Sequence, residues 1–291
     1  MKTWGISILS FILLTVSTAF NHPDATSYYN SGVNALNSKD YIKAIGDFTN
    51  AISMNPKYAD AYFYRAYSKE LLGIKMGFTS SEMCSDLVMA MYYGKKEAAG
   101  KLEKTCMSEC FSMDMAFDEP EIVYCADFSS KVLSDLPAGS SKLTYLVKLN
   151  MFNNKLTSMS KEWEKLDKLV SLDLGSNKLT SISPSIGKLT HLKELNLNKN
   201  PITTLPVEIG NLKNLETLTL RQNGLTQFPA SIAMLSSLEN LDLALNKLTS
   251  LPLEIANLKN LKTLTLVGNE LPSKEQHKIK ALLPNTKIYF E

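Results

Sequence analysis

Between residues 149 and 269 the sequence repeats itself with a fixed step of 23 residues. One leucine returns at that step, and an asparagine follows it in every copy. The leucines are Leu149, Leu172, Leu195, Leu218, Leu241 and Leu264, and the asparagines are Asn154, Asn177, Asn200, Asn223, Asn246 and Asn269. A degenerate earlier copy contains Ala126, Phe128, Lys131, Leu133, Leu136 and Pro137. Since so short a unit cannot bury its own apolar side chains, we expect the units to stack and share one core.

Each unit follows the pattern LxxLxLxxNxLxxLPxxIxx, which residues 215–229 show as LETLTLRQNGLTQFP. The alternation LxL points two leucines to one side, as in a short β-strand. The asparagine follows at a turn, where its amide can bond backbone groups that the strand leaves open. The segment LP and the later isoleucine bring the chain back along the far side. Stacked units of this kind predict a parallel sheet.

The pattern resembles the leucine-rich repeat family, in the LPxxI form typical of bacterial and plant-type variants. The resemblance covers roughly residues 120–291 and implies an α/β leucine-rich-repeat solenoid with a curved parallel sheet, which we place at residues 119–291. In this family the outward-pointing strand residues form a concave face that commonly binds a partner. The residues we expect to contact a protein or peptide ligand are Asn150, Phe152, Asp173, Asn196, Thr219, Arg221, Asp242 and Thr265. The alternative is a solvated face that only keeps the solenoid in solution.

After Pro272 the 23-residue step is lost, and the segment SKEQHKIKALL reads as a helix. Ser273 is the expected N-cap, with Gln276 completing a capping box. Ile279, Leu282 and Leu283 would cover the last repeat, and KIYF would add a closing strand. We therefore interpret the C-terminal segment as a cap.

Residues 24–118 show helical periodicity in place of the 23-residue step. Tyr28 returns as Tyr62 with a step of 34, and Pro56 ends the second helix. A further helix is expected at about residues 95–106. This segment resembles the tetratricopeptide repeat, which implies an all-α helical-repeat domain before the solenoid.

A tetratricopeptide groove in this sequence would present Tyr29, Phe63 and Tyr67. The Lys and Asn side chains that grip a terminal carboxylate in some members of that family are missing at the comparable positions, so an apolar peptide or helix would be the ligand. Aromatic residues at helical spacing usually form a core, so simple packing inside the module is the favoured alternative.

The N-terminus has the composition of a secretory signal peptide. A basic residue, Lys2, precedes an apolar stretch and a small-residue exit that ends at Ala19. We expect residues 1–19 to be removed and the protein to be secreted or held in the periplasm or at the cell surface, without membrane insertion after cleavage. The signal and the repeat subtype together suggest a bacterial source.

Four cysteines remain after that cleavage, and four allow three complete pairings. If two helices meet near Lys95, then Cys84 and Cys106 are equidistant from the turn, which favours a bridge between them. Cys110 would then pair with Cys125. Zinc binding is disfavoured because no CxxC pair occurs and an oxidising compartment favours disulfides.

No group of residues predicts catalysis. The phosphate-binding, zinc-protease and serine-hydrolase motifs do not occur, and His22, His191 and His277 lie apart from any suitable nucleophile. We therefore expect no enzyme activity, no cofactor and no bound metal. The net charge of +2 argues against a nucleic-acid partner recruited by bulk charge.

These features predict an exported, non-catalytic protein–protein interaction protein that recognises its partner on the concave face. The alternative is an assembly or scaffold factor that binds through the helical module, with the solenoid as a spacer.

Overall fold

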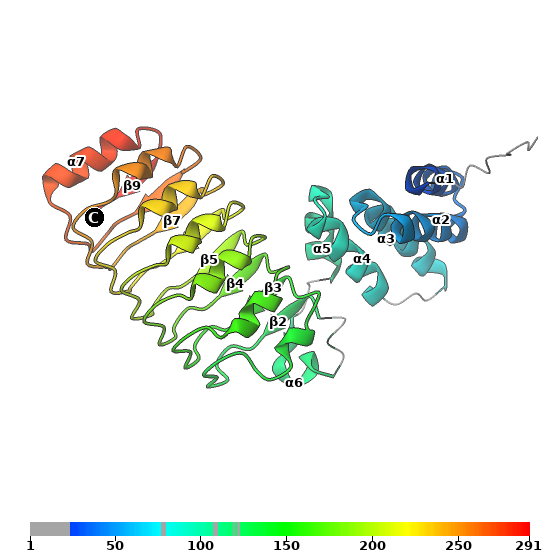
Figure 1. Ribbon diagram of the computed structural model, residues 1–291, viewed down its shortest axis with the longest axis horizontal. Helices are drawn as coiled ribbons and strands as arrows, with labels where there is room; N and C mark the ends of the chain where they lie inside the picture. The colour runs from blue at the N-terminus through cyan, green and yellow to red at the C-terminus, as the bar shows by residue number, and fades with distance from the viewer. Residues whose placement is uncertain (1–23, 77–79, 107–109, 119, 121–122) are drawn as a thin grey trace, which may run out of the picture.

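The computed structural model describes residues 24–76, 80–106, 110–118, 120 and 123–291. The predicted signal peptide, residues 1–19, lies outside the described residues. Figure 1 shows a helical region at one end of the molecule, a stack of coils along its length, and a single helix over the last coil. The predicted fold class, a helical region followed by a parallel-sheet solenoid, is confirmed.

The helical region contains α1 (Ala25–Asn37), α2 (Tyr41–Met54), α3 (Ala59–Met76), α4 (Ser80–Tyr92) and α5 (Lys96–Cys106). Two aspartates begin the first two helices: Asp24 accepts a hydrogen bond from Ser27 N at 2.7 Å, and Asp40 accepts one from Lys43 N at 3.1 Å. Such caps satisfy backbone N–H groups that have no partner inside the helix. The helix expected at about residues 95–106 is present as α5.

A buried carboxylate joins α3 to α4. Asp86 is only 3% exposed, and Arg65 binds it through two nitrogens, at 2.6 and 3.0 Å. Lys69 Nζ lies 3.0 Å from the same carboxylate. Two cations around one buried anion offset the desolvation that the carboxylate would otherwise suffer.

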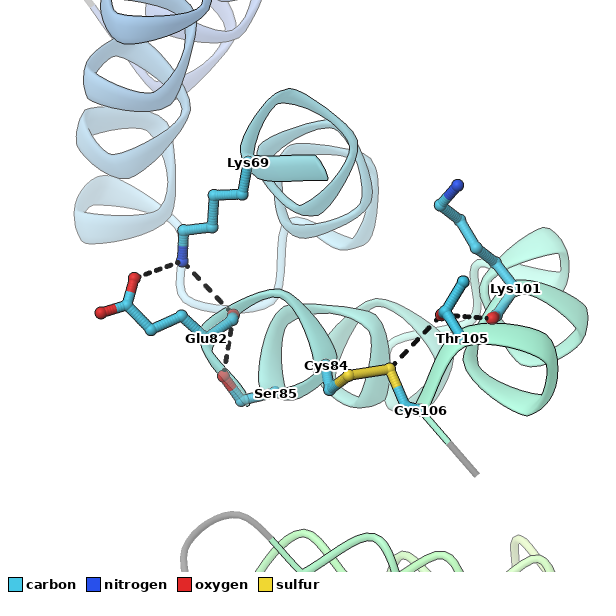
Figure 2. Close-up of a disulfide and its surroundings, with 7 residues drawn as sticks. All are labelled: Lys69, Glu82, Cys84, Ser85, Lys101, Thr105 and Cys106. Carbon is cyan, nitrogen blue, oxygen red and sulfur yellow. Dashed lines mark hydrogen bonds and ion pairs between the residues drawn. A yellow bond between two sulfur atoms is a disulfide. The ribbon is translucent and has the colours of Figure 1, made fainter. Parts of the chain in front are cut away.

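Both predicted disulfides are present. Cys84 of α4 is bonded to Cys106 of α5, and Figure 2 shows this bridge beside the Lys69–Glu82 ion pair. Cys110 is bonded to Cys125. The two bridges close loops of 22 and 15 residues, a length for which a disulfide typically contributes about 3 kcal/mol of stability.

The described part of the solenoid contains a nine-stranded parallel sheet in chain order. Its strands are β1 (Phe111–Ser112), β2 (Cys125–Asp127), β3 (Lys148–Asn150), β4 (Ser171–Asp173), β5 (Glu194–Asn196), β6 (Thr217–Thr219), β7 (Asn240–Asp242), β8 (Thr263–Thr265) and β9 (Lys287–Tyr289). The helix α6 (Met113–Ala116) follows β1 directly. The central leucines of β3 to β8 are paired in register at the 23-residue step, and all are at most 1% exposed. The degenerate copy forms β2, in register with β3.

The return side of the coils is built from short 3₁₀ helices. They are η2 (Ser140–Lys142), η3 (Lys161–Lys165), η4 (Pro184–Lys188), η5 (Val207–Asn211), η6 (Ala230–Met234) and η7 (Leu253–Asn257). A Cβ at Gly187 would lie 2.8 Å from the Glu208 carbonyl oxygen, so neighbouring coils approach too closely there for a side chain. Ile186, Ile209, Ile232 and Ile255 are fully buried and complete the core behind the strands.

The repeated asparagines bond backbone groups through their amides, as the sequence predicted, and the structure shows that these groups belong to two neighbouring coils. Asn200 Nδ2 donates to the Leu197 carbonyl of its own coil at 3.1 Å and to the Leu174 carbonyl of the previous coil at 3.0 Å. Its Oδ1 accepts from Leu179 N at 3.1 Å. The other five asparagines make corresponding bonds along the solenoid. Asn154, Asn177, Asn200 and Asn246 are buried, and Asn223 and Asn269 are half-buried.

The C-terminal cap is present, but its N-cap prediction is wrong. The helix α7 (Ser273–Leu282) begins at Ser273 itself, and Pro272 occupies the N-cap position without a side-chain bond. Gln276 Nε2 donates to the Leu271 carbonyl at 3.0 Å and so does not complete a capping box. Proline has the extended backbone that an N-cap requires, which moves the helix start by one residue. The predicted closing strand is β9, paired with β8.

Candidate binding face and the junction beside it

The eight predicted contact residues all lie on the strand side of the solenoid. Asn150, Asp173, Asn196, Thr219, Asp242 and Thr265 occupy the last position of consecutive strands, β3 to β8, and each is half-buried. Phe152 and Arg221 follow β3 and β6 and are exposed. With neighbouring strands about 4.8 Å apart, the six strand-end residues extend over about 24 Å.

Three of these side chains are joined across neighbouring coils. Asn196 Nδ2 donates to Asp173 Oδ1 at 2.9 Å, and Thr219 Oγ1 donates to Asn196 Oδ1 at 2.9 Å. Asp173 Oδ1 also accepts from Gly175 N at 2.8 Å. Because these bonds fix the rotamers, the middle of the concave face presents a preorganised polar line.

An aromatic ring covers one end of this polar line. Phe152 is 38% exposed, and its ring lies where a Cβ on Gly175 would be 3.1 Å away. A residue with a side chain at position 175 would therefore push the ring aside. At the far end of the solenoid, Leu245 similarly occupies the space above Gly268.

A hollow of about 520 Å³ lies over the first half of the concave face. Asn150, Asp173, Asn196 and Thr219 line it. The structure therefore brings four of the predicted contact residues to one hollow, which we call the concave hollow. Asp242 and Thr265 do not line it.

The predicted helical-module residues have different surroundings. Tyr29 packs with the core of α1 and α2, and its ring stacks on Tyr58 with centroids 4.9 Å apart. Phe63 is half-buried, with Lys95 Nζ 5.3 Å from the centroid of its ring. Tyr67 is 38% exposed, and Lys101 Nζ lies 5.2 Å from the centroid of its ring.

The helical region is docked onto the edge of the solenoid. Tyr62, Leu87 and Leu102 of the helices share one buried cluster with Tyr124 and Val147 of the first coils. A shared core of this kind makes the two parts a single packed body.

A polar contact extends this interface. Tyr92 donates to the Asp167 carboxylate at 3.1 Å and stacks on the His191 ring with centroids 4.7 Å apart. Burial first, and then the Asp167 carboxylate, raises the pKa of the Tyr92 hydroxyl. Lys168 Nζ lies 4.8 Å from the centroid of the Tyr92 ring.

A second hollow, of about 300 Å³, lies where α5 meets the solenoid; we call it the junction hollow. Ala99, Gly100 and Glu103 of α5 line one side, and Val147, Lys148, Val170, Ser171 and Glu194 line the other. Sequence reasoning missed this site. A signal was nevertheless available, because Val147 and Val170 stand where the later repeats carry the charged residues Lys193, Glu216, Glu239 and Lys262.

Among the residues that the structure describes, no three His, Cys, Asp or Glu side chains gather in a way that could hold a metal ion. The same described residues include no helix long and apolar enough to cross a membrane.

Comparison with known families identifies the repeats. Residues 177–283 match the family model described as leucine-rich repeat region, and residues 144–202 match the leucine rich repeat model. Residues 144–283 therefore carry leucine-rich repeats, in a fold that commonly mediates protein–protein interaction. A curated relative, an uncharacterised protein of Methanocaldococcus jannaschii, is 42% identical over 53 residues, which is 18% of this chain and 62% of that protein.

Several solved structures are similar to the solenoid. A leucine-rich repeat protein of Leptospira interrogans is 33% identical with a TM-score of 0.49, over 59% of this chain and 50% of its own. The plant peptide hormone receptor RGFR1, solved in complex with RGF2, is 29% identical with a TM-score of 0.48, over 56% of this chain and 27% of its own. An internalin (InlF) of Listeria monocytogenes is 21% identical with a TM-score of 0.47, over 58% of this chain and 55% of its own.

Proposed function

We propose that this chain is an exported, non-catalytic recognition protein that binds a protein or peptide on the concave face of its solenoid. Its contact residues are those that the sequence predicted: Asn150, Phe152, Asp173, Asn196, Thr219, Arg221, Asp242 and Thr265.

The hydrogen-bonded line Asp173–Asn196–Thr219 on the floor of the concave hollow is the observation that carries this proposal. Fixed polar groups bind a partner with less loss of side-chain entropy than free ones. Their remaining donors and acceptors discriminate between partners more than they add affinity. The exposed Phe152 and Arg221 flank this line, and both residue types are enriched in protein–protein interfaces.

Export is supported by the two disulfides, Cys84–Cys106 and Cys110–Cys125. Bridges of this kind form and persist in oxidising compartments, and they are rare in the cytosol. The apolar stretch and small-residue exit in residues 1–19 agree with this location.

Affinity capture from the surface fraction of the native host, read by mass spectrometry, tests the proposal. The concave variant Asp173→Lys plus Thr219→Arg removes one negative charge from the hydrogen-bonded line, adds two positive charges to it, and breaks its hydrogen bonds. A matched control, Glu254→Lys plus Asn257→Arg, makes the same charge change at exposed positions of η7. We expect the concave variant to lose the captured partner and the control to keep it; equal retention by both variants would refute the concave assignment.

The second candidate is partner binding through the helical module. Of its three predicted residues, Tyr67 is the exposed one. Deleting residues 24–118 cannot decide between the two candidates, because it would uncover Tyr124 and Val147. The substitution Tyr67→Ala avoids that defect, and loss of capture by this variant alone would favour the helical module.

A further inference from the structure

The junction hollow has an apolar base, and its side formed by α5 has no side chain at Gly100. Leu102 and Val147 are buried at its base, and Val170 beside them is half-buried. At Gly100, a Cβ would meet no heavy atom within 4 Å outside its own helix. The volume of about 300 Å³ lies at the lower end of the range for ligand pockets. It therefore has room for one large inserted side chain.

The junction hollow borders the concave hollow. Lys148, Ser171 and Glu194, the first residues of β3, β4 and β5, line both of them. An extended peptide that crosses the concave face can therefore place one of its side chains against α5.

Carboxylates outnumber ammonium groups around the two hollows. The lining residues include Glu103, Asp173, Glu194 and Glu216 but only two cations, Lys148 and Lys193. Lys193 is already paired with Glu216 at 2.7 Å. Glu194 accepts a bond only from the neutral Ser171 hydroxyl, at 2.9 Å, and Asp173 only from neutral N–H groups, within the part of the chain that the structure describes. Both carboxylates therefore remain available to a cationic ligand.

From this geometry we infer that the ligand is a peptide segment in which a large apolar residue lies close to a lysine or arginine. The apolar side chain enters the junction hollow against Leu102, Val147 and Val170. The basic side chain meets Glu194 and Asp173, where the lining charge is complementary to it. This inference rests on the proposed function and adds the partner's chemistry and a contact with α5.

Selection from a random-peptide display library against the full chain tests the inference. Enriched peptides are then synthesised with a fluorophore, and their affinities are measured by anisotropy. We expect the enriched peptides to share an aromatic or large aliphatic residue near a lysine or arginine. Replacing that apolar residue by alanine should weaken binding at least about tenfold, as the loss of one buried apolar side chain predicts.

Gly100 and Gly46 provide a matched pair of variants, because a Cβ at either position meets open space. Gly100→Phe fills the junction hollow, whereas Gly46→Phe adds the same side chain on α2, where a Cβ also meets no atom within 4 Å. We expect Gly100→Phe to weaken binding at least about tenfold, because the new ring takes the place of the inserted apolar side chain. Glu194→Lys should weaken it by a similar factor, because it places a like charge beside the basic residue of the ligand. Gly46→Phe should leave the affinity within about twofold. Unchanged thermal unfolding of the three variants confirms that they fold.

The outcomes separate this inference from the proposed function. If Gly100→Phe binds the peptides like the wild-type chain while Asp173→Lys plus Thr219→Arg does not, the junction contact is wrong and the concave face remains. If neither change matters, both proposals are wrong. Enrichment of acidic peptides, or of no peptide family, would also overturn the inference.

Discussion

Each buried asparagine of the solenoid uses one amide to hold two coils together. Asn200 is 4% exposed and bonds backbone groups of residues 174, 179 and 197. Removing such an amide leaves buried carbonyl and N–H groups without partners, and each such group costs about 1–3 kcal/mol.

We therefore expect Asn200→Ala to lower the free energy of unfolding by about 3 kcal/mol. The control Asn211→Ala changes an exposed asparagine of η5 and should stay within about 0.5 kcal/mol of the wild type. Chemical denaturation monitored by circular dichroism measures both. A loss of similar size in the two variants would contradict the role of the buried amide.

Tyr29 gives the helical region a defined sensitivity to alkaline pH. Burial, and then the Asp60 carboxylate, raises the pKa of Tyr29 from its usual value of 10.0 to about 12. Between these values the folded chain keeps a phenolic proton that the unfolded chain has released. The free energy of unfolding therefore falls as the pH rises from about 10 to about 12.

Tyr29→Phe removes this titration, so the variant should lose less thermal stability than the wild type between about pH 8 and pH 11.5. Melting temperatures of both proteins across that range provide the test. Parallel losses in the two proteins would show that Tyr29 titrates alike in the folded and unfolded chains.

Sequence reasoning at the level of single residues succeeded where the repeat fixed the position. The asparagines and strand leucines were predictable because six copies place them in one register. The start of α7 lies outside the repeats, so no second copy of the sequence shows whether Pro272 or Ser273 is the N-cap. The structure has Pro272 at that position.

At the scale of elements, the contact between α1 and α2 depends on one glycine. A Cβ at Gly32 would lie 2.7 Å from the Phe48 ring, too close for the two helices to keep their distance. Gly46, in the middle of α2, has open space around the same position. Alanine substitutions at Gly32 and Gly46 therefore distinguish the effect of side-chain packing on stability from the effect of helix propensity.

Gly32→Ala should destabilise the protein by about 1–3 kcal/mol, because overpacking outweighs the gain in helix propensity. Gly46→Ala should be neutral or stabilise it by up to about 1 kcal/mol. Thermal and denaturant unfolding of the two variants compare these effects directly. Stabilisation by both substitutions would mean that Phe48 can move away freely.

The fixed step also made the order and register of the strands predictable, since a parallel coil returns each leucine beside its predecessor. The docking of α3 to α5 onto the first coils was not predictable from periodicity. The sequence indicates this docking only at one repeat position, where the first copies have Val147 and Val170 and the later copies have Lys193 and Glu216. A consensus of the repeats does not show this difference. The junction hollow is formed by that docking, so it was not predictable from the sequence either.

At the scale of the whole molecule, the helical region and the solenoid form one packed body. The cluster around Leu87, Leu102, Tyr124 and Val147 contains residues of both parts. The helical region therefore also completes one side of the surface on which we place the ligand. A ligand that contacts α5 and β3 to β6 would therefore bind the helical region and the solenoid at the same time.

Site-specific photocrosslinking tests the concave binding face most directly. A benzophenone amino acid replaces Asn240, which is exposed at the start of β7 and is not one of the proposed contact residues, or Leu253, which is 60% exposed on η7. Each full-length protein is irradiated with the surface fraction of the native host. We predict a crosslinked partner from position 240 and none from position 253. A partner crosslinked from position 253 and absent from position 240 would contradict binding on the concave face.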